Sequence, residues 1–149
     1  MSRADIGEIT EAADMECAFA IRREVFCVEQ GVSAAEEFDG LDHECRTYLI
    51  RLSDEAVGTA RVRRLDGGTV KIERMAVLEP HRGRGHGRAL MRRMIADIRG
   101  DGVETVTLHA QCHAEEFYRR LGFTPEGAEF IEAGIAHVRM GLGGKRTRD

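Results

Sequence analysis

The spacing of apolar residues along the chain changes between a helical period and strict alternation. Met15, Ala18 and Phe19 begin a stripe with a period of about 3.6 residues, which predicts a helix from Thr10, as its N-cap, to about residue 27. A second long helix is expected at about 85–99, and shorter helices near 33–38 and 113–121. Alternating or short apolar runs predict strands at 6–10, 48–52, 56–65, 70–78, 103–110, 123–131 and 135–142.

Glycine-containing turns separate these elements. Asp66-Gly67-Gly68 is expected to form a hairpin turn, and Gly122 to end the short helix before it. Strands and helices do not alternate strictly, so the order indicates a mixed-sheet α/β domain of the α+β type rather than a doubly wound fold. We expect residues 1–142 to form a single domain and 143–149 to form a polar, disordered tail.

Composition narrows the class of protein. The chain has 149 residues, of which 42% are hydrophobic and 32% charged, as in ordinary soluble proteins. No apolar run approaches the ~20 residues of a membrane span, and the N-terminus lacks the apolar core of a signal peptide. The four cysteines are scattered, which favours reduced thiols in a cytoplasmic protein. The net charge of −4 argues against general affinity for nucleic acid.

Charge is distributed unevenly. Residues 24–44 contain seven acidic side chains and no Lys or Arg, whereas residues 82–99 contain six arginines and one acid, Asp97. Arginines gathered beside a glycine-rich turn indicate an anion site, although a solvated helix face is the alternative. Arg88 and Arg92, four residues apart and close to the turn, are the better candidates for contact with a ligand.

The glycine-rich turn lies between a predicted strand and a predicted helix. Gly83, Gly85 and Gly87 permit a positive φ and let backbone N–H groups converge on one point. The helix that follows adds unpaired N–H groups and a partial positive charge, which together favour a phosphate. Counted from Gly83, the sixth position of a dinucleotide-binding fingerprint is the bulky Arg88, and no Lys-Ser/Thr pair of a P-loop follows.

Arg82-x-x-Gly85-x-Gly87 resembles the pyrophosphate loop of the GNAT N-acetyltransferases, which bind acetyl-coenzyme A. Residues 111–123 are similar to a second GNAT block, with Gln111 where Asn is usual. Residues 22–31, 37–42 and 129–140 resemble the small ElaA-type branch of that superfamily. The resemblance covers about residues 20–142. It implies the GNAT fold, a mixed and mostly antiparallel sheet of about seven strands flanked by about four helices.

The resemblance also implies a reaction. Acetyl-CoA would be the co-substrate and a primary amine of a small molecule or peptide the acceptor. Backbone N–H groups before the glycine turn would contact the acetyl carbonyl and pantetheine. The cofactor-binding residues implied are Met75, Ala76, Val77, Arg82, Gly83, Arg84, Gly85, His86, Gly87, Arg88, Gln111, Ala114 and Phe117.

Two side chains are candidates for proton transfer. Tyr118 lies where the family often places a tyrosine that protonates the leaving thiolate; the alternative is a core tyrosine with a satisfied hydroxyl. Glu73 is the candidate base, because strand alternation places it on the same face as Met75 and Val77 unless a bulge intervenes. The alternative for Glu73 is an ion pair with an arginine of the preceding strand, Arg61 or Arg63.

His109, Gln111, Cys112 and His113 cluster where the strand at 103–110 ends. They straddle a strand–helix junction with no fourth ligand, so we expect no metal. His109, Gln111 and His113 are better interpreted as contacts to the acceptor amine or as polar surface. A nucleophilic Cys112 is a further alternative.

The acidic loop at 28–44 is expected to border the acceptor pocket and to favour a cationic acceptor, with a solvated loop as the alternative. Two alternative hypotheses for the function are a non-catalytic coenzyme-A-binding module and an acyltransferase similar to the acyl-homoserine-lactone synthases. A homodimer through exposed strand edges is plausible.

Overall fold

The computed structural model describes residues 4–143, so the expected tail lies outside the described residues except for Gly143. The described residues form one eight-stranded sheet in the order β1-β2-β3-β4-β5-β8-β6, with β7 paired to β8. Its neighbours are antiparallel except β4 and β5, which are parallel. The strands are β1 (Ala4–Ile9), β2 (Cys45–Leu52), β3 (Glu55–Arg64), β4 (Thr69–Val77), β5 (Thr105–Gln111), β6 (Thr124–Pro125), β7 (Phe130–Glu132) and β8 (Ile135–Leu142).

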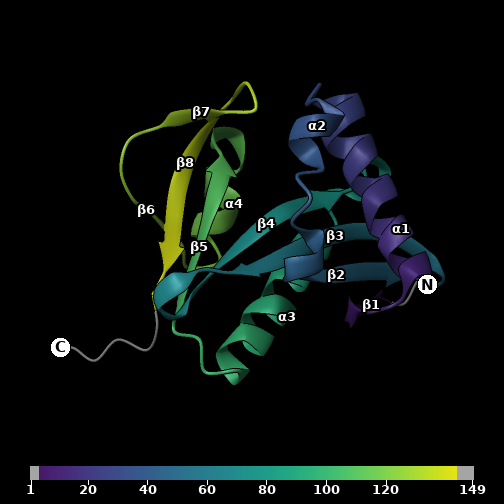
Figure 1. The fold of residues 1–149 in the computed structure, drawn as a ribbon, viewed down its shortest axis with the longest axis horizontal. Helices are drawn as coiled ribbons and strands as arrows, with labels where there is room; N and C mark the ends of the chain where they lie inside the picture. Colours follow the sequence, from purple (N-terminus) through teal and green to yellow (C-terminus); the bar gives the residue numbers. More distant parts are fainter. Residues whose placement is uncertain (1–3, 144–149) are drawn as a thin grey trace.

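Helices cover both faces of the sheet (Figure 1). Along β2, Tyr48 and Ile50 pack with the cluster beneath α3, while Leu49 between them packs with α1 on the other face. Alternation along one strand therefore supplies two cores. The helices are α1 (Ala12–Arg22), the π-helical segment η1 (Arg23–Glu29), α2 (Ala34–Glu37), α3 (His86–Gly100) and α4 (Glu115–Arg119), which the 3₁₀ turn η5 (Cys112–Ala114) precedes.

Three local expectations are corrected. The N-cap of α1 is Glu11 rather than Thr10, and no side chain caps this helix. The helix expected to reach residue 27 changes to π-helix at Arg23, a geometry that often accompanies functional sites. The strand expected at 123–131 is interrupted between β6 and β7, where Gly127 has a φ of 92°, and this division gives eight strands instead of about seven.

β4 and β5 separate halfway along their length. Their pairing runs from Thr69 with Thr105 to Ile72 with Leu108 and then stops, and Figure 1 shows the two strands diverging beyond that point. A β-strand that loses its neighbour exposes backbone N–H and C=O groups. The splayed strands therefore offer unpaired backbone groups in the middle of the sheet.

A bulge at Arg74 changes which face the residues of β4 occupy. The register with β3 shifts between Arg61↔Glu73 and Thr59↔Ala76, and Arg74 has a φ of 59°. Two residues of β4 thus oppose one of β3, which reverses the alternation. Met75 packs with the cluster under α3, whereas Glu73 hydrogen-bonds with Arg61 on the other face. The expectation that Glu73 and Met75 share a face is wrong for this reason.

Candidate active site

A cavity of about 510 Å³ opens where β4 and β5 separate. Residues of η1 and α2 form one wall, and β5 with the β7–β8 hairpin forms the opposite wall. Its lining includes both predicted catalytic residues, Tyr118 and Glu73, and several residues predicted to bind the cofactor, namely Met75, Ala76, Val77, Arg82, Gln111 and Ala114. The fold therefore gathers residues that lie more than forty positions apart in the sequence.

Tyr118 reaches the cavity from α4. Its ring packs edge-on against Phe117 and Phe123, with centroids 4.9 and 6.1 Å away. Burial raises the pKa of the phenol to about 12, so the group stays protonated at neutral pH. Among residues 4–143 its hydroxyl has no hydrogen-bond partner, which leaves the proton available to a ligand in the cavity. The role of Tyr118 as the acid stays a prediction.

The backbone of β4 presents Val77 to the gap. Leu78 donates its N–H to Val57 O at 2.9 Å, and alternation in an antiparallel ladder then turns the N–H of Val77 away from β3. β5 has already stopped pairing at Ile72, so the Val77 N–H faces the open split. The same alternation directs the N–H of Ala76 toward β3.

Arg82 fixes the end of β4. Its Nε donates to Val77 O at 2.7 Å, and its two terminal nitrogens bind the Glu29 carboxylate at 3.0 and 2.6 Å. The guanidinium thus ties the glycine turn to both β4 and η1. Because Arg82 donates a hydrogen bond to the carbonyl of Val77, the backbone N–H is the polar group of Val77 that stays free on the side of the split.

The glycine turn forms an uncapped helix start. Gly83 and Gly85 have φ values of 78° and 86°, and no side chain caps α3 at Gly85. The first hydrogen bond of the helix runs from Ala89 N–H to Gly85 O at 3.0 Å. The N–H groups of the preceding helical residues, His86 to Arg88, therefore have no intrahelical acceptor. Such a helix start attracts an anion.

Gly87 has a different role from the one expected, since its φ is not positive. A Cβ atom there would lie 2.8 Å from Met75 Cε and 3.4 Å from Phe117 Cζ. This glycine lets the start of α3 approach β4 and α4. Phe117, predicted to contact the cofactor, supports the glycine turn from behind and does not line the cavity.

The arginines of α3 divide into two groups. Arg93 pairs with Asp97 at 3.2 Å and donates to Ile6 O, and Arg99 donates to Gly143 O. In the described part of the chain, Arg88 and Arg92 have no such partners, and both are exposed. They lie within two turns of the helix start, where their positive charges add to the field of the free N–H groups.

Gln111 bridges the two walls of the cavity. It exchanges hydrogen bonds with Gln30, at 3.1 and 2.8 Å, and its amide oxygen lies 2.7 Å from His113 Nε2. Gln30 follows the π-helical segment, so this contact joins η1 to the end of β5. Sequence reasoning did not find Gln30, because its partner is 81 residues away.

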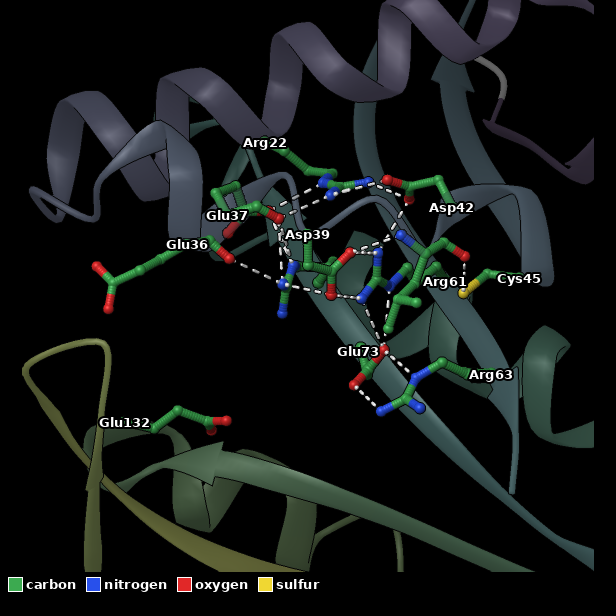
Figure 2. A network of polar contacts seen from close by, with 12 residues as sticks. Arg22, Glu36, Glu37, Asp39, Asp42, Cys45, Arg61, Arg63, Glu73 and Glu132 are labelled. Carbon is green, nitrogen blue, oxygen red and sulfur yellow. Dashed lines mark hydrogen bonds and ion pairs between the residues drawn. The ribbon is translucent and has the colours of Figure 1, made fainter. Parts of the chain in front are cut away.

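Glu73 lies in an ionic cluster. Its carboxylate contacts Arg61, Arg63 and Lys71 at 2.9 to 3.1 Å, as Figure 2 shows for the two arginines. Although burial opposes ionisation, Arg63 and the other cations lower the pKa of Glu73 to about 2. Ion pairs with Arg61 and Arg63, the alternative to catalysis, are therefore present. A carboxylate with so low a pKa is a weak proton acceptor, and its role as a base stays a prediction.

The acidic loop is largely neutralised by buried arginines (Figure 2). Arg22 binds Glu37 at 2.9 Å and Asp42 at 2.6 Å, and Arg61 binds Asp39 at 2.7 Å. Both guanidinium groups are only 1% exposed. The loop therefore serves to fix α2 over the sheet, and it adds less negative charge to the cavity than its sequence suggests.

The opposite wall carries a cluster of rings. His109 Nδ1 lies 3.1 Å from Glu132 Oε1, and His137 Nε2 lies 3.9 Å from the same oxygen. Phe130 packs edge-on against His109 and stacks on His137, at 4.9 and 5.8 Å between centroids. The sequence analysis did not identify Glu132 and His137 as site residues, because only their position beside a turn sets them apart from other polar residues. All four cysteines, including Cys112, are free thiols.

Within residues 4–143 no cluster of three His, Cys, Asp or Glu side chains is placed to hold a metal ion. Over the same residues, none of the helices has the length and apolar character needed to cross a membrane.

Comparison with known proteins identifies the family. The acetyltransferase (GNAT) domain family matches residues 10–143, and the chain belongs to this family. YyaT of Bacillus subtilis (strain 168) is 39% identical over 139 residues, covering 91% of this chain and 93% of YyaT. Escherichia coli ElaA is 28% identical in its crystal structure, with a TM-score of 0.83 over 95% of this chain and 99% of that chain.

A Bacillus subtilis acetyltransferase crystallised in complex with CoA shares the fold, at 19% identity and a TM-score of 0.68 over 96% of this chain and 99% of that chain. The predictions of the superfamily, of similarity to the ElaA-type branch and of the GNAT fold are confirmed.

Proposed function

We propose that the protein is an acetyl-CoA-dependent N-acetyltransferase that acetylates a primary amine of a small molecule or peptide. One observation carries the proposal: Tyr118 lines the same cavity that opens where β4 and β5 separate. In this cavity the unpaired phenol proton of Tyr118 can act on the sulfur of a thioester, and the N–H of Val77 can act on its carbonyl oxygen. The uncapped start of α3 supplies a place for the phosphates beyond the end of β4.

The residues act on charge that develops during transfer. The Val77 N–H would donate to the acetyl oxygen, which becomes an oxyanion when the amine attacks. The leaving thiolate has a pKa of about 8.5 by analogy with cysteine, so it accepts a proton readily. Tyr118 would donate that proton and recover one from the reaction or from solvent. Its raised pKa keeps it in the donating form.

The acceptor is proposed from the chemistry of the site rather than from the charge of the acidic loop. On the cavity wall, four carboxylates are opposed by three cations; the carboxylates are those of Glu36, Glu37, Glu73 and Glu132, and the cations are those of Lys71, Arg74 and Arg82. A nearly balanced wall does not strongly select a cation. The reaction still requires a neutral amine, and an alkyl ammonium with a pKa of about 10.4 supplies about one such molecule in 2,500 at pH 7.

Calorimetric titration with acetyl-CoA tests the first half of the proposal, with ATP and NAD as control ligands. We expect saturable binding of acetyl-CoA and much weaker binding of NAD. Release of free coenzyme A thiol in the presence of a panel of primary amines tests the second half. Binding with no amine-dependent release would favour a regulatory coenzyme-A-binding module. Preferential binding of either control nucleotide would refute the assignment of the glycine turn.

A further inference from the structure

The wall of the cavity opposite α2 holds a histidine, His109, that has no part in the steps proposed above for Tyr118 and Val77. His109 lies on β5, where Leu108 and Ala110 pack into the cluster under α3. Alternation turns His109 to the opposite face, and its ring lines the cavity. Tyr118 packs against the α3 side of the sheet. The two side chains therefore approach the split between β4 and β5 from opposite faces.

The orientation of His109 is fixed by a carboxylate. Its Nδ1 lies 3.1 Å from Glu132 Oε1, and since an ionised carboxylate only accepts hydrogen bonds, Nδ1 carries the proton. In the neutral ring Nε2 then holds the lone pair. Within residues 4–143 no hydrogen bond engages this nitrogen. The edge-on contact with Phe130, at 4.9 Å between centroids, limits rotation of the ring.

The surroundings keep His109 in its neutral form. Burial, and then the charge of Lys71 on β4, lower its pKa below the ordinary value, and Glu132 on β7 opposes them. On β8, His137 adds a smaller repulsion, and Arg139, the ladder partner of His109, turns to Glu126 at 3.3 Å. Glu73 on β4 is held by its own cations, and Glu36 and Glu37 line the far wall. At neutral pH the ring is thus free to accept a proton.

From this geometry, and resting on the proposed function, we infer that His109 is the base that deprotonates the acceptor amine and that Glu132 is its positioning residue. His109 Nε2 takes one proton from R–NH₃⁺, and the freed lone pair forms the C–N bond to the thioester carbonyl. The C–S bond then breaks, and the sulfur takes the proton of Tyr118. The amide nitrogen loses its second proton, which restores the tyrosine, and His109 releases its proton to solvent. One proton is released overall.

Two amines of different basicity test this assignment on the purified full chain. Ethylamine is an ammonium at pH 7 and needs the base, whereas trifluoroethylamine is already neutral. For His109→Gln we expect kcat/KM at pH 7 to fall about 100-fold with ethylamine and by less than about 3-fold with trifluoroethylamine. The matched control is His43→Gln, an exposed histidine of the 3₁₀ turn at Asp42–Glu44, which should leave both values unchanged.

The pH profile gives an independent readout. With a base acting on the bound ammonium, kcat/KM for ethylamine should be level between about pH 7 and pH 9. In His109→Gln it should rise about tenfold per pH unit over the same interval, because the variant depends on free neutral amine. Glu132→Gln should keep the level region. Without the carboxylate the pKa of His109 falls, so the acid limb should move to lower pH.

Each outcome decides the matter. Equal losses with both amines, or a wild-type profile that rises steadily to pH 9, would remove His109 from the role of base while leaving the transferase proposal in place. If wild-type protein acetylates neither these two amines nor any amine of the panel, the proposed function fails and the base with it. Acetyl-CoA binding by each variant verifies its fold. Should His109→Gln not fold, the shift of the acid limb in Glu132→Gln tests the assignment instead, and an unmoved limb would overturn it.

Discussion

Replacing Glu73 with Gln separates a structural role of this carboxylate from a catalytic one. Glutamine has the shape of the protonated acid, so the variant loses the charge but little volume. In the folded protein the pKa of Glu73 falls from its ordinary 4.5 to about 2. At 1.36 kcal/mol per pKa unit, ionised Glu73 stabilises the fold by about 3 kcal/mol. The side chain is only 6% exposed, so solvent screens this interaction little.

The stabilisation has a defined pH dependence. Because the pKa of folded Glu73 lies below that of the unfolded chain, the stabilisation is fully present above pH 4.5 and is lost as the pH falls towards about 2. Urea unfolding at pH 7 should therefore show Glu73→Gln to be less stable by about 3 kcal/mol, and the difference should narrow at lower pH. Glu126→Gln is the control, since its pair with Arg139 is about half exposed and worth at most about 1 kcal/mol.

Turnover completes the test. If Glu73 acts through the ion cluster, the variant should keep its kcat/KM for an amine within about tenfold, whereas loss of a general base costs roughly 100-fold to 10,000-fold. A variant as stable as the wild type but more than 100-fold slower would refute our reasoning. It would identify Glu73 as the base and His109 as a wall residue.

Three further substitutions, with one control substitution, test the cofactor site and the acid. Tyr118→Phe should lower kcat/KM about 100-fold while the Kd for acetyl-CoA stays the same; an equal loss of affinity would argue for a packing role. Gly85→Asp places a charge and a Cβ at a φ of 86°, so calorimetry should show acetyl-CoA affinity reduced by at least about 100-fold. Arg88→Met should weaken acetyl-CoA binding several-fold at low salt and less at high salt. The guanidinium of Arg93 is already paired with Asp97, so the control Arg93→Met should leave acetyl-CoA binding unchanged. Equal effects of the two substitutions would remove Arg88 from the phosphate site.

The sequence predicted the elements whose residues carry a strong local pattern. Leu90, Met91, Met94 and Ile98 form the buried face of α3, and their spacing already marks a helix. Ser33 lies before α2 and accepts the N–H of Glu36 at 3.2 Å, as expected of a cap residue. The glycine turn follows from residues that favour a positive φ. Such features depend on neighbours in the sequence.

The features that sequence reasoning missed depend on distant neighbours. At the bulge, the guanidinium of Arg74 contacts Glu37 and Asp39, which lie some 35 residues earlier. Arg22 and Arg61 carry no local sign of burial, because the acids that neutralise them come from the loop between the two. His109 was found only as one member of a polar cluster. Its carboxylate partner, Glu132, comes from a hairpin 23 residues later.

The acetyltransferase activity is tested most directly by a mass-spectrometric assay of the purified protein with acetyl-CoA and a panel of primary amines, run beside a thiol-release assay. We expect one acetylated amine for each coenzyme A released, and a rate that falls sharply in Tyr118→Phe. Binding of acetyl-CoA with no acetylated amine and no thiol release above the uncatalysed rate would contradict the assignment of this cavity as an acetyltransferase active site.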